Sequence, residues 1–169
     1  ELSEFKVRGN LTATYEKKPF TFSFHEPREV LGMEPAIKWN LLANSTDGSY
    51  IRNKIIRDLA YESVDAYEPE GTFTELYLNG VYQGLYLLTE AVEIAENRIE
   101  IEPDENWFVE MELDFRARED ETQIVTKRGQ IFIVHSEYGV SKEDLKAIEE
   151  RLNDVESALF AEDGISTVS

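Results

Sequence analysis

Apolar and polar positions alternate along the first part of the chain. The segment 20–24 carries a phenylalanine at every second position, which is typical of a strand with one buried face. A shorter alternation at 5–8 ends at a glycine-asparagine pair at 9–10, so two strands around a turn are predicted. We interpret 26–32 as a loop or short turn that leads into a compact apolar run at 39–43.

A helix is predicted over 51–60, because apolar residues recur there at spacings of three and four. Asp47 or Ser49 is placed to accept hydrogen bonds from the free amide groups at its start. We expect this helix to pack its apolar stripe on a sheet, and the stripe consists of Ile51, Ile55, Ile56, Leu59 and Ala60.

The segment 73–88 predicts a β-hairpin. Asn79-Gly80 separates two runs rich in β-forming residues, and both residue types tolerate the positive φ of a two-residue turn. Gly84 is interpreted as a bulge. The hairpin tyrosines fit cross-strand packing, with a carbohydrate-binding platform as the alternative.

The last third of the chain repeats the change from strand to helix. Alternation predicts strands over 107–115, 122–126 and 130–134. Ser141 resembles an amino-terminal cap for a helix that continues to residue 159. With no internal repeat and no interior linker, the pattern predicts an α+β fold, a mainly antiparallel sheet with packed helices, as a single domain or partial domain over 1–169.

Charge narrows the choice of partners. Seventeen basic and 35 acidic residues give a net charge of −18, which repels nucleic acid and anionic membrane surfaces, so neither is an expected partner. A nucleotide site would need a local concentration of cations or a divalent metal. The chain has no cysteine, which excludes disulfides, thiolate zinc sites and a cysteine nucleophile.

Four colinear blocks over about residues 5–160 carry a family resemblance. They are Arg8-Gly9-Asn10 with 17–20; Leu31-Gly32-Met33 with 39–44; 76–80 with 82–90; and Glu112-Leu113-Asp114. Together these blocks resemble the CotH kinase family of atypical, spore-coat-protein-H-like protein kinases. The order of two strands with a lysine, a helix and a hairpin also agrees with the amino-terminal lobe of a kinase.

The resemblance implies a remote protein-kinase fold that transfers the γ-phosphoryl group of ATP to Ser. The implied partners are ATP and a protein substrate from a spore coat or the secreted fraction, and the implied cofactors are ATP and Mg²⁺. A spore coat or the extracellular bacterial surface is the implied location.

A kinase lobe needs a cation on the nucleotide phosphates and an acid that orients the cation. We predict Lys18 as the cation and Asp58 as the acid; solvated surface charges are the alternative. Arg8 and Asn10 flank a glycine that permits close approach to phosphate, although this chain has Leu11-Thr12 where the family has Ser-Thr.

Five further candidates follow from position. Asn44 and Arg52 lie where a loop leads into the predicted helix, which suits either anion contacts or capping. Glu90 would lie near the adenine-side connection between kinase lobes, or else begin an acidic connector. Glu112 and Asp114 are candidate Mg²⁺ ligands on a strand whose alternation also fits a solvated sheet face.

In the family, the acidic catalytic and metal-binding residues lie in an Asn-Glu-Leu-Thr-like and a Trp-Asp-x-Asp-like segment. Neither segment occurs in these 169 residues. We therefore expect the carboxy-terminal catalytic lobe to be absent and this chain alone to be inactive. The alternative is a non-catalytic surface or interaction module built on the same fold.

Overall fold

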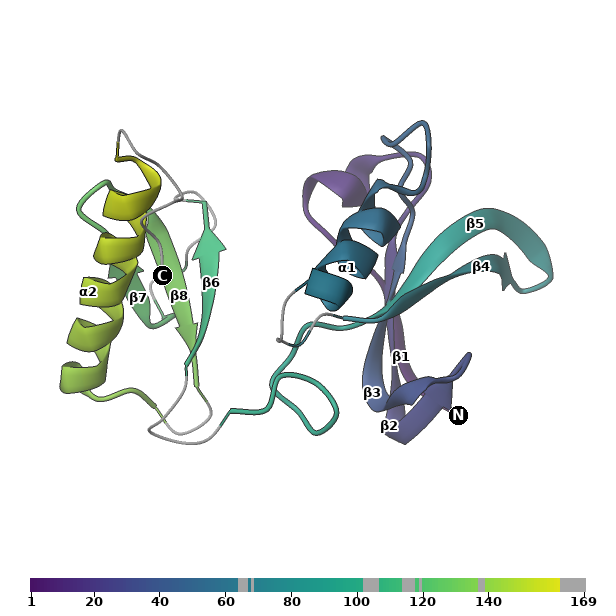
Figure 1. Cartoon of the computed structure of the whole chain (residues 1–169). Coiled ribbons are helices and arrows are strands. Elements are labelled where there is room, and N and C mark those ends of the chain that lie inside the picture. Colours follow the sequence, from purple (N-terminus) through teal and green to yellow (C-terminus); the bar gives the residue numbers. More distant parts are fainter. Residues whose placement is uncertain are drawn as a thin grey trace. The chain divides into compact units, whose positions relative to one another are not determined.

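The computed structural model describes residues 1–63, 67, 69–101, 107–113, 118, 120–136 and 139–161. The chain forms two compact units, Glu1–Glu100 and Ile101–Ser169, and each is described here by itself (Figure 1). Both units combine antiparallel strands with a helix, which confirms the predicted α+β class. That 1–169 acts as a single or partial domain stays a prediction.

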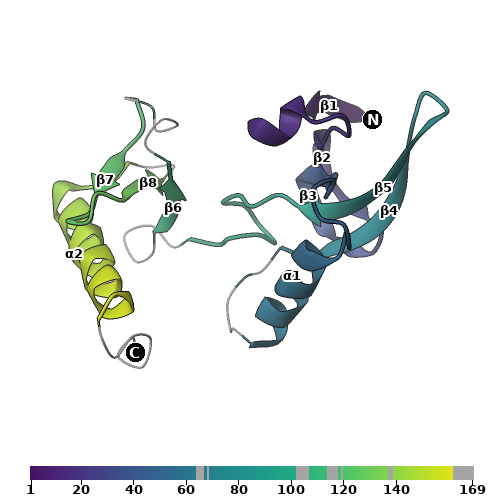
Figure 2. The same cartoon turned by 90° about the horizontal axis from the view of Figure 1, so that it is seen from above.

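The first unit is built on a five-stranded sheet with the strand order β1-β2-β3-β5-β4, in which all neighbours are antiparallel (Figures 1 and 2). A short 3-10 helix η1 lies between β1 and β2, and helix α1 lies between β3 and β4. The elements are β1 (Leu2–Val7), η1 (Leu11–Thr14), β2 (Phe20–Val30), β3 (Met33–Leu42), α1 (Arg52–Ser63), β4 (Gly71–Leu78) and β5 (Val81–Glu90).

One face of this sheet forms the hydrophobic core. Phe20 pairs with Leu41, and Leu41 with Leu88, so the three side chains form a buried row across β2, β3 and β5. Trp39 and Tyr86 extend the same face and are almost fully enclosed. Burying each such side chain contributes about 1.5–3 kcal/mol, so this row fixes the register of the strands next to the loops that form the site.

The prediction of a loop at 26–32 is wrong, because β2 continues to Val30 and β3 begins at Met33. The connection is a two-residue turn in which Leu31 and Gly32 have φ values of 54° and 85°. Register irregularities between Ser23 and Val30 let the strands continue where the alternation fails. These irregularities hide the strands from a search for regular spacing.

The predicted hairpin is confirmed. Leu78 pairs with Val81 around a turn in which Asn79 and Gly80 have φ values of 50° and 81°. The register shifts opposite Gly84, which has a φ of 101°, so the predicted bulge is also present.

Helix α1 is confirmed, but the expected burial of its apolar stripe is wrong. Ile55, Ile56 and Leu59 are 46%, 67% and 55% exposed. Among the helix residues whose side chains are described, the half-buried ones are Lys54, Arg57 and Ala60. Long basic side chains can bury their aliphatic stems while the charge reaches a polar partner, and Arg57 donates to the carbonyl of Pro69 in this way.

The second unit pairs a three-stranded sheet, ordered β6-β8-β7, with one long helix (Figure 1). Ile148 of the helix packs on Ile124 and Val134 of the sheet. The predicted cap is confirmed, because the Ser141 hydroxyl accepts from the Asp144 amide at 3.0 Å. The elements are β6 (Phe108–Glu112), β7 (Gln123–Val125), β8 (Ile131–His135) and α2 (Lys142–Leu159).

Neither described helix combines the length and the apolar character needed to cross a lipid bilayer.

Candidate functional site

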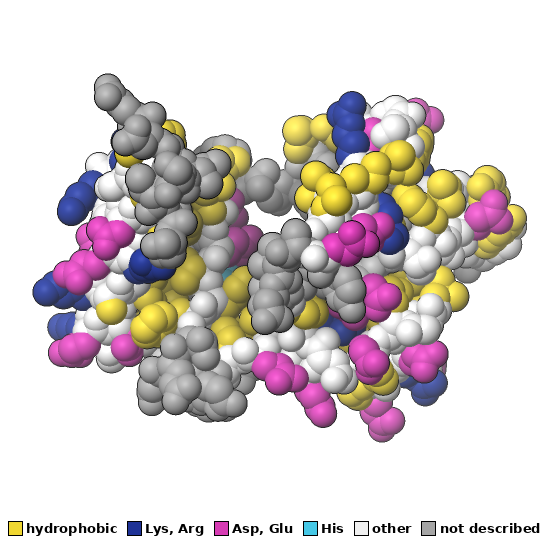
Figure 3. Space-filling model, in the orientation of Figure 1, with side chains coloured by type: hydrophobic (Ala, Val, Ile, Leu, Met, Phe, Trp, Pro, Cys, Tyr) yellow, Lys and Arg dark blue, Asp and Glu magenta, His cyan; other side chains and the backbone are white. Residues whose placement is uncertain are grey.

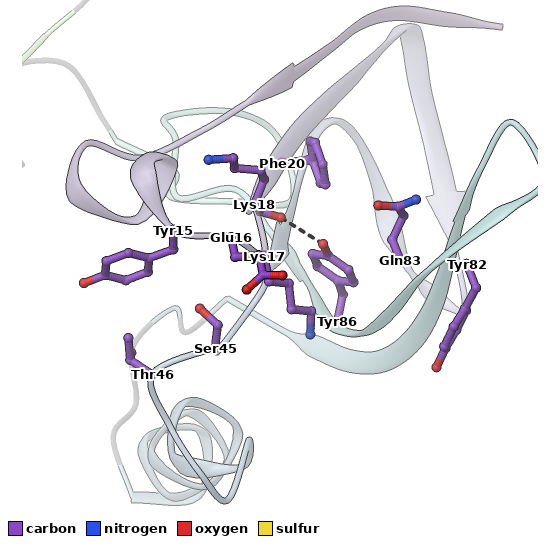
Figure 4. Close-up of a pocket in the computed structure, with 10 residues that line it drawn as sticks. All are labelled: Tyr15, Glu16, Lys17, Lys18, Phe20, Ser45, Thr46, Tyr82, Gln83 and Tyr86. Atoms are coloured by element: carbon purple, nitrogen blue, oxygen red, sulfur yellow. Dashed lines mark hydrogen bonds between the residues drawn. The ribbon is translucent and has the colours of Figure 1, made fainter.

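Two neighbouring cavities lie in the first unit, where β1, β2 and β3 meet the loop that leads to α1. The smaller has a volume of about 160 Å³ and the larger, drawn in Figure 4, about 620 Å³. Tyr15, Lys17, Ser45 and Thr46 line both cavities. The Lys17 side chain therefore belongs to the wall that the two cavities share.

Lys17 is held in place by the end of β3, by β5 and by the loop before α1. Its ammonium group donates to the carbonyl of Ala43 at 3.1 Å and to that of Leu85. The ammonium nitrogen lies 4.5 Å from the ring centroid of Tyr86 and 4.8 Å from that of Tyr50. Because an ammonium group has three N–H donors, the two carbonyls leave one donor for a ligand.

The bulge in β5 contributes to this arrangement. A Cβ atom at Gly84 would lie 3.5 Å from Cε of Lys17, which is an ordinary van der Waals contact, so the lysine stem packs directly on this glycine. The φ of 101° also disfavours residues that carry a side chain. Gly84 therefore provides the backbone bend against which the Lys17 side chain packs.

Arg8 lines the smaller cavity from the end of β1. Its backbone amide donates to Pro19, while no described residue accepts a hydrogen bond from its guanidinium group. The next residue, Gly9, has a φ of 81°, and a Cβ atom there would lie 2.2 Å from the Thr12 hydroxyl oxygen. The glycine thus lets η1 fold back, so that the Thr12 side chain joins Arg8 in the cavity lining.

Asn44 and Asn53 also line the smaller cavity. The Asn44 amide donates to the carbonyl of Tyr50 at 3.0 Å, and its oxygen accepts from the Asn53 amide at 2.7 Å. Asn44 itself has a φ of 46°, a conformation that Asn tolerates better than most residues. The two amides tie the loop after β3 to the first turn of α1 and keep a polar wall on the cavity.

The smaller cavity concentrates positive charge in an acidic protein. Burial, followed by the charge of Arg57, lowers the pKa of Arg8. Burial alone lowers the pKa of Lys17. Figure 3 shows acidic side chains distributed over the visible faces of both units. The cations of the cavity are therefore partly desolvated, and an anion bound between them would favour their charged forms.

The structure places the predicted cation Lys18 apart from Lys17. Its ammonium group donates to the carbonyl of Ala13 at 2.9 Å, and the side chain lines only the larger of the two cavities. Figure 4 shows the two lysine side chains pointing in different directions. Lys18 also supplies a backbone carbonyl that accepts from the Tyr86 hydroxyl at 2.9 Å.

Three other candidates lie outside the cavity linings. Asp58 is exposed and accepts from Lys54 one helical turn earlier, and its described contacts include neither Lys17 nor Lys18. Arg52 pairs with Asp47, and its side chain is 80% exposed. Asn10 is exposed at the start of η1 and makes no side-chain cap.

Asp47 caps α1, as predicted. Its carboxylate accepts from the Ser49 hydroxyl and from the backbone amides of Arg52 and Ser49. These hydrogen bonds, led by that from the Ser49 hydroxyl, lower the pKa of Asp47. The start of the helix is therefore occupied by a carboxylate of the chain.

Glu90 lies in a buried network, which we call the Arg98 cluster: Arg98, Glu90, Tyr67 and Trp39. The ion pair between Arg98 and Glu90 is 2.7 Å long, with side chains 0% and 5% exposed. Glu90 also accepts from the Tyr67 hydroxyl at 2.9 Å and from the Glu70 amide at 3.0 Å. The carboxylate is thus enclosed by partners from the chain itself.

The candidate metal ligands belong to the second unit. Glu112 accepts from the backbone amide of Leu113 at 2.8 Å, and Asp114 lies outside the described residues. Within the described ranges, no group of three or more His, Cys, Asp or Glu side chains could hold a metal ion.

Sequence reasoning chose Lys18 and not Lys17 as the cation, because two adjacent lysines precede β2 and local spacing does not distinguish them. The groups that do so, the carbonyls of Ala43 and Leu85, are 26 and 68 residues away along the chain. Thr12 was given no role of its own, because attention fell on Leu11, which departs from the Ser-Thr of the family pattern. Its role in the cavity depends on the fold of η1.

A comparison with curated proteins gives no significant match. The model of one family, described as CotH kinase protein, matches residues 5–166 and thus nearly the whole chain. The match spans the sheet of the first unit, the loops that form both cavities, and the second unit. The chain therefore belongs to the CotH kinase family.

Proposed function

We propose that the smaller cavity binds the polyphosphate of ATP. In this proposal the chain is the nucleotide-binding part of a protein kinase that transfers the γ-phosphoryl group to Ser of a spore-coat or secreted protein. The family match implies a kinase-like use of nucleotide. The observation that carries the proposal is the convergence of Arg8 and Lys17 on one polar cavity in a chain with a net charge of −18.

The side chains around the cavity suit phosphate oxygens. The Arg8 guanidinium has a planar set of donors that fits two phosphate oxygens at once. The third N–H donor of Lys17, the Thr12 hydroxyl and the Asn53 amide add further donors around the same space. A polyphosphate would replace the water that burial has removed from both cations.

Phosphoryl transfer depends on positioning and on neutralising charge, and the first unit can supply the first of these. The described residues contain no group of three or more His, Cys, Asp or Glu side chains that could hold a metal ion. We therefore assign this unit the task of holding the polyphosphate and derive no metal-dependent step from it.

Calorimetric titration with ATP tests the binding proposal. Lys17→Met is expected to weaken ATP binding at least tenfold, because a charge-assisted hydrogen bond to phosphate is worth about 1.5–3 kcal/mol. Lys146→Met is the matched control, since Lys146 lies on α2 with its side chain 77% exposed and its loss changes the net charge equally. Equal affinity of the two variants for ATP would refute the phosphate site.

The reaction itself requires a separate measurement. Isotopic phosphate transfer from ATP to a serine-containing acceptor is expected for the full-length protein and is expected to be lost in Lys17→Met. Transfer that persists at the wild-type rate in Lys17→Met would contradict the assigned role of this lysine.

A second candidate function is a non-catalytic interaction module, and the exposed apolar stripe of α1 supports it. Figure 3 shows hydrophobic side chains at the surface of the first unit. Ile56 is the most exposed residue of the apolar stripe on α1. This function predicts that Ile56→Lys abolishes capture of a protein partner while Lys17→Met leaves capture unchanged. ATP binding that depends on Lys17 would favour the kinase function instead.

A further inference from the structure

Lys17 has no carboxylate partner among the described residues, although a kinase lobe orients its phosphate-binding cation with an acid. Asp58, the acid predicted on α1, is exposed and pairs with Lys54 one helical turn earlier. The loop that leads into α1 instead brings an aromatic ring to the lysine, because the Lys17 ammonium nitrogen lies 4.8 Å from the ring centroid of Tyr50. An aromatic ring thus lies beside Lys17, where a carboxylate was expected.

We propose that Tyr50 is a positioning residue, whose ring holds the Lys17 ammonium group in place for the polyphosphate of ATP in the smaller cavity. This inference rests on the proposed function and adds to it the group that orients the cation. It assigns Tyr50 no contact with ATP, since Tyr50 lines neither cavity. The ring acts on the ligand only through Lys17.

The backbone of Tyr50 has an unusual conformation for an aromatic residue. Its φ of 63° lies in the left-handed region, which is sterically unfavourable for residues other than Gly, Asn and Asp. Strained positions of this kind persist where the surrounding structure fixes them, and they are common at binding sites. The turn alone would favour Gly or Asn, so the ring itself is the feature that accounts for a tyrosine at this position.

Hydrogen bonds of the loop hold Tyr50 in this conformation. Its backbone amide donates to the carbonyl of Asp47 at 2.9 Å, and its carbonyl accepts from the Asn44 amide at 3.0 Å. The side-chain oxygen of Asn44 in turn accepts from Asn53 on α1 at 2.7 Å. The position of the ring is thus tied to the first turn of α1, and Tyr50 links this helix to the cation.

Two rings hold the Lys17 ammonium group, and they differ in their other contacts. Tyr86 on β5 is 2% exposed, has its ring centroid 4.5 Å from the same nitrogen, and donates its hydroxyl to the Lys18 carbonyl. Tyr50 is half-buried, and its hydroxyl donates to no described residue. The ring is therefore the part of Tyr50 that contacts the lysine. An aromatic face attracts a cation without placing a formal negative charge beside the polyphosphate.

Calorimetric titration of the whole chain with inorganic tripolyphosphate tests the effect on binding. Tyr50→Asn removes the ring but keeps a residue that tolerates the positive φ, and it should weaken binding about three- to tenfold. Tyr50→Phe keeps the ring and should retain the wild-type affinity. Leu31→Asn is the matched control, because Leu31 also has a positive φ, is 63% exposed and lines neither cavity. Its affinity should equal that of the wild type.

The place of the lysine is measured separately, from the NMR signals of the Lys17 Cε protons in protein with isotopically labelled lysine. Ring currents of the two tyrosines should displace these signals upfield from those of exposed lysines, and Lys17→Arg identifies them by their loss. Tyr50→Phe should keep the displacement, and Tyr50→Asn should reduce it. Wild-type Lys17 signals that coincide with those of exposed lysines would refute the positioning role without any variant of Tyr50.

The outcomes separate this inference from the proposed function. If Lys17→Met weakens tripolyphosphate binding while Tyr50→Asn binds it like the wild type, the positioning role is refuted and the phosphate site stands. Equal weakening by Tyr50→Asn and Tyr50→Phe also refutes it, because the ring is then not the active part. Weakening by Tyr50→Asn with unmoved Lys17 signals refutes it as well, since the effect does not pass through the lysine. Unchanged binding in Lys17→Met refutes the phosphate site itself, and the positioning role with it.

Discussion

Two places in the first unit hold positive charge away from water, and they do so differently. In the Arg98 cluster the guanidinium group is 0% exposed, lies 2.7 Å from Glu90, and stacks over Trp39 at 5.2 Å. In the smaller cavity Arg8 is only half-buried, and no described carboxylate pairs with it or with Lys17.

In our proposal, this difference separates a structural charge, that of Arg98, from the binding charges of Arg8 and Lys17. Arg98 has a carboxylate partner within the chain, together with carbonyls of Asn97 and Glu34. Its charge therefore contributes to holding residues 91–100 against the sheet. Arg8 and Lys17 keep donors available, and the lowered pKa of each shows that burial disfavours its charge in the free protein. An anionic ligand would supply the missing partner.

The largest expected effect comes from breaking the buried pair. Glu90→Gln keeps an oxygen for Tyr67 and Glu70 but leaves Arg98 uncompensated, which should lower the free energy of unfolding by about 3–5 kcal/mol. Urea unfolding followed by Trp39 fluorescence, with Trp107→Phe as background, measures it. Glu4→Gln, in an exposed pair with Lys6, should change stability little. A loss below about 1 kcal/mol in Glu90→Gln would show that the buried pair is not structural.

A smaller effect is expected in the loop of the binding region. Gly9→Ala should lower stability by about 1–2 kcal/mol, because the residue has a positive φ and its Cβ would collide with Thr12. ATP affinity should fall as well, since the collision displaces Thr12 from the cavity. Gly48→Ala meets no atom within 4 Å and serves as the control. Unchanged stability and affinity in Gly9→Ala would exclude this role of the loop.

The lowered pKa of Lys17 predicts a pH dependence of binding. The ligand needs the charged ammonium group, so tripolyphosphate affinity should fall as pH rises through the lowered pKa of Lys17, below the range of an exposed lysine. The fall should reach about tenfold, or about 1.4 kcal/mol, because Arg8 stays charged. In Lys17→Arg, tripolyphosphate affinity should not fall over this pH range. A fall of equal size in that variant would show that a group other than Lys17 causes the pH dependence.

The smallest effect is expected on the outer side of α1. Asp58→Ala removes an exposed pair with Lys54, which should cost about 0.3–0.5 kcal/mol and leave ATP affinity unchanged. Thermal unfolding and calorimetry measure both quantities. A tenfold loss of ATP affinity in Asp58→Ala would restore this carboxylate as the acid that orients the cation.

Sequence reasoning correctly predicted the turns, bulges and caps that a few neighbouring residues determine. The Asn79-Gly80 turn, the Gly84 bulge and the Ser141 cap each depend on a few adjacent residues, and all three are present. The β2–β3 hairpin was missed because its irregular register hides the alternation around Leu31.

The candidate site was predicted less completely, because some of its groups are far apart in the sequence and meet only in the folded sheet. Arg8 and Asn44 were found because each lies in a short motif, and both line the smaller cavity. Choosing Lys17 over Lys18 requires the carbonyls of Ala43 and Leu85, which only the folded sheet brings to the lysine. The burial of Glu90 depends in the same way on Arg98, which turns back onto the sheet.

Hydrogen–deuterium exchange with and without ATP tests the central claim most directly, because it reports on both regions in one measurement. We predict that ATP slows amide exchange at 8–18 and 43–46, which border the smaller cavity, and leaves 90–98 unchanged. Slower exchange at 90–98, with no change at 8–18, would contradict the assignment of Arg8 and Lys17 as the phosphate-binding cations.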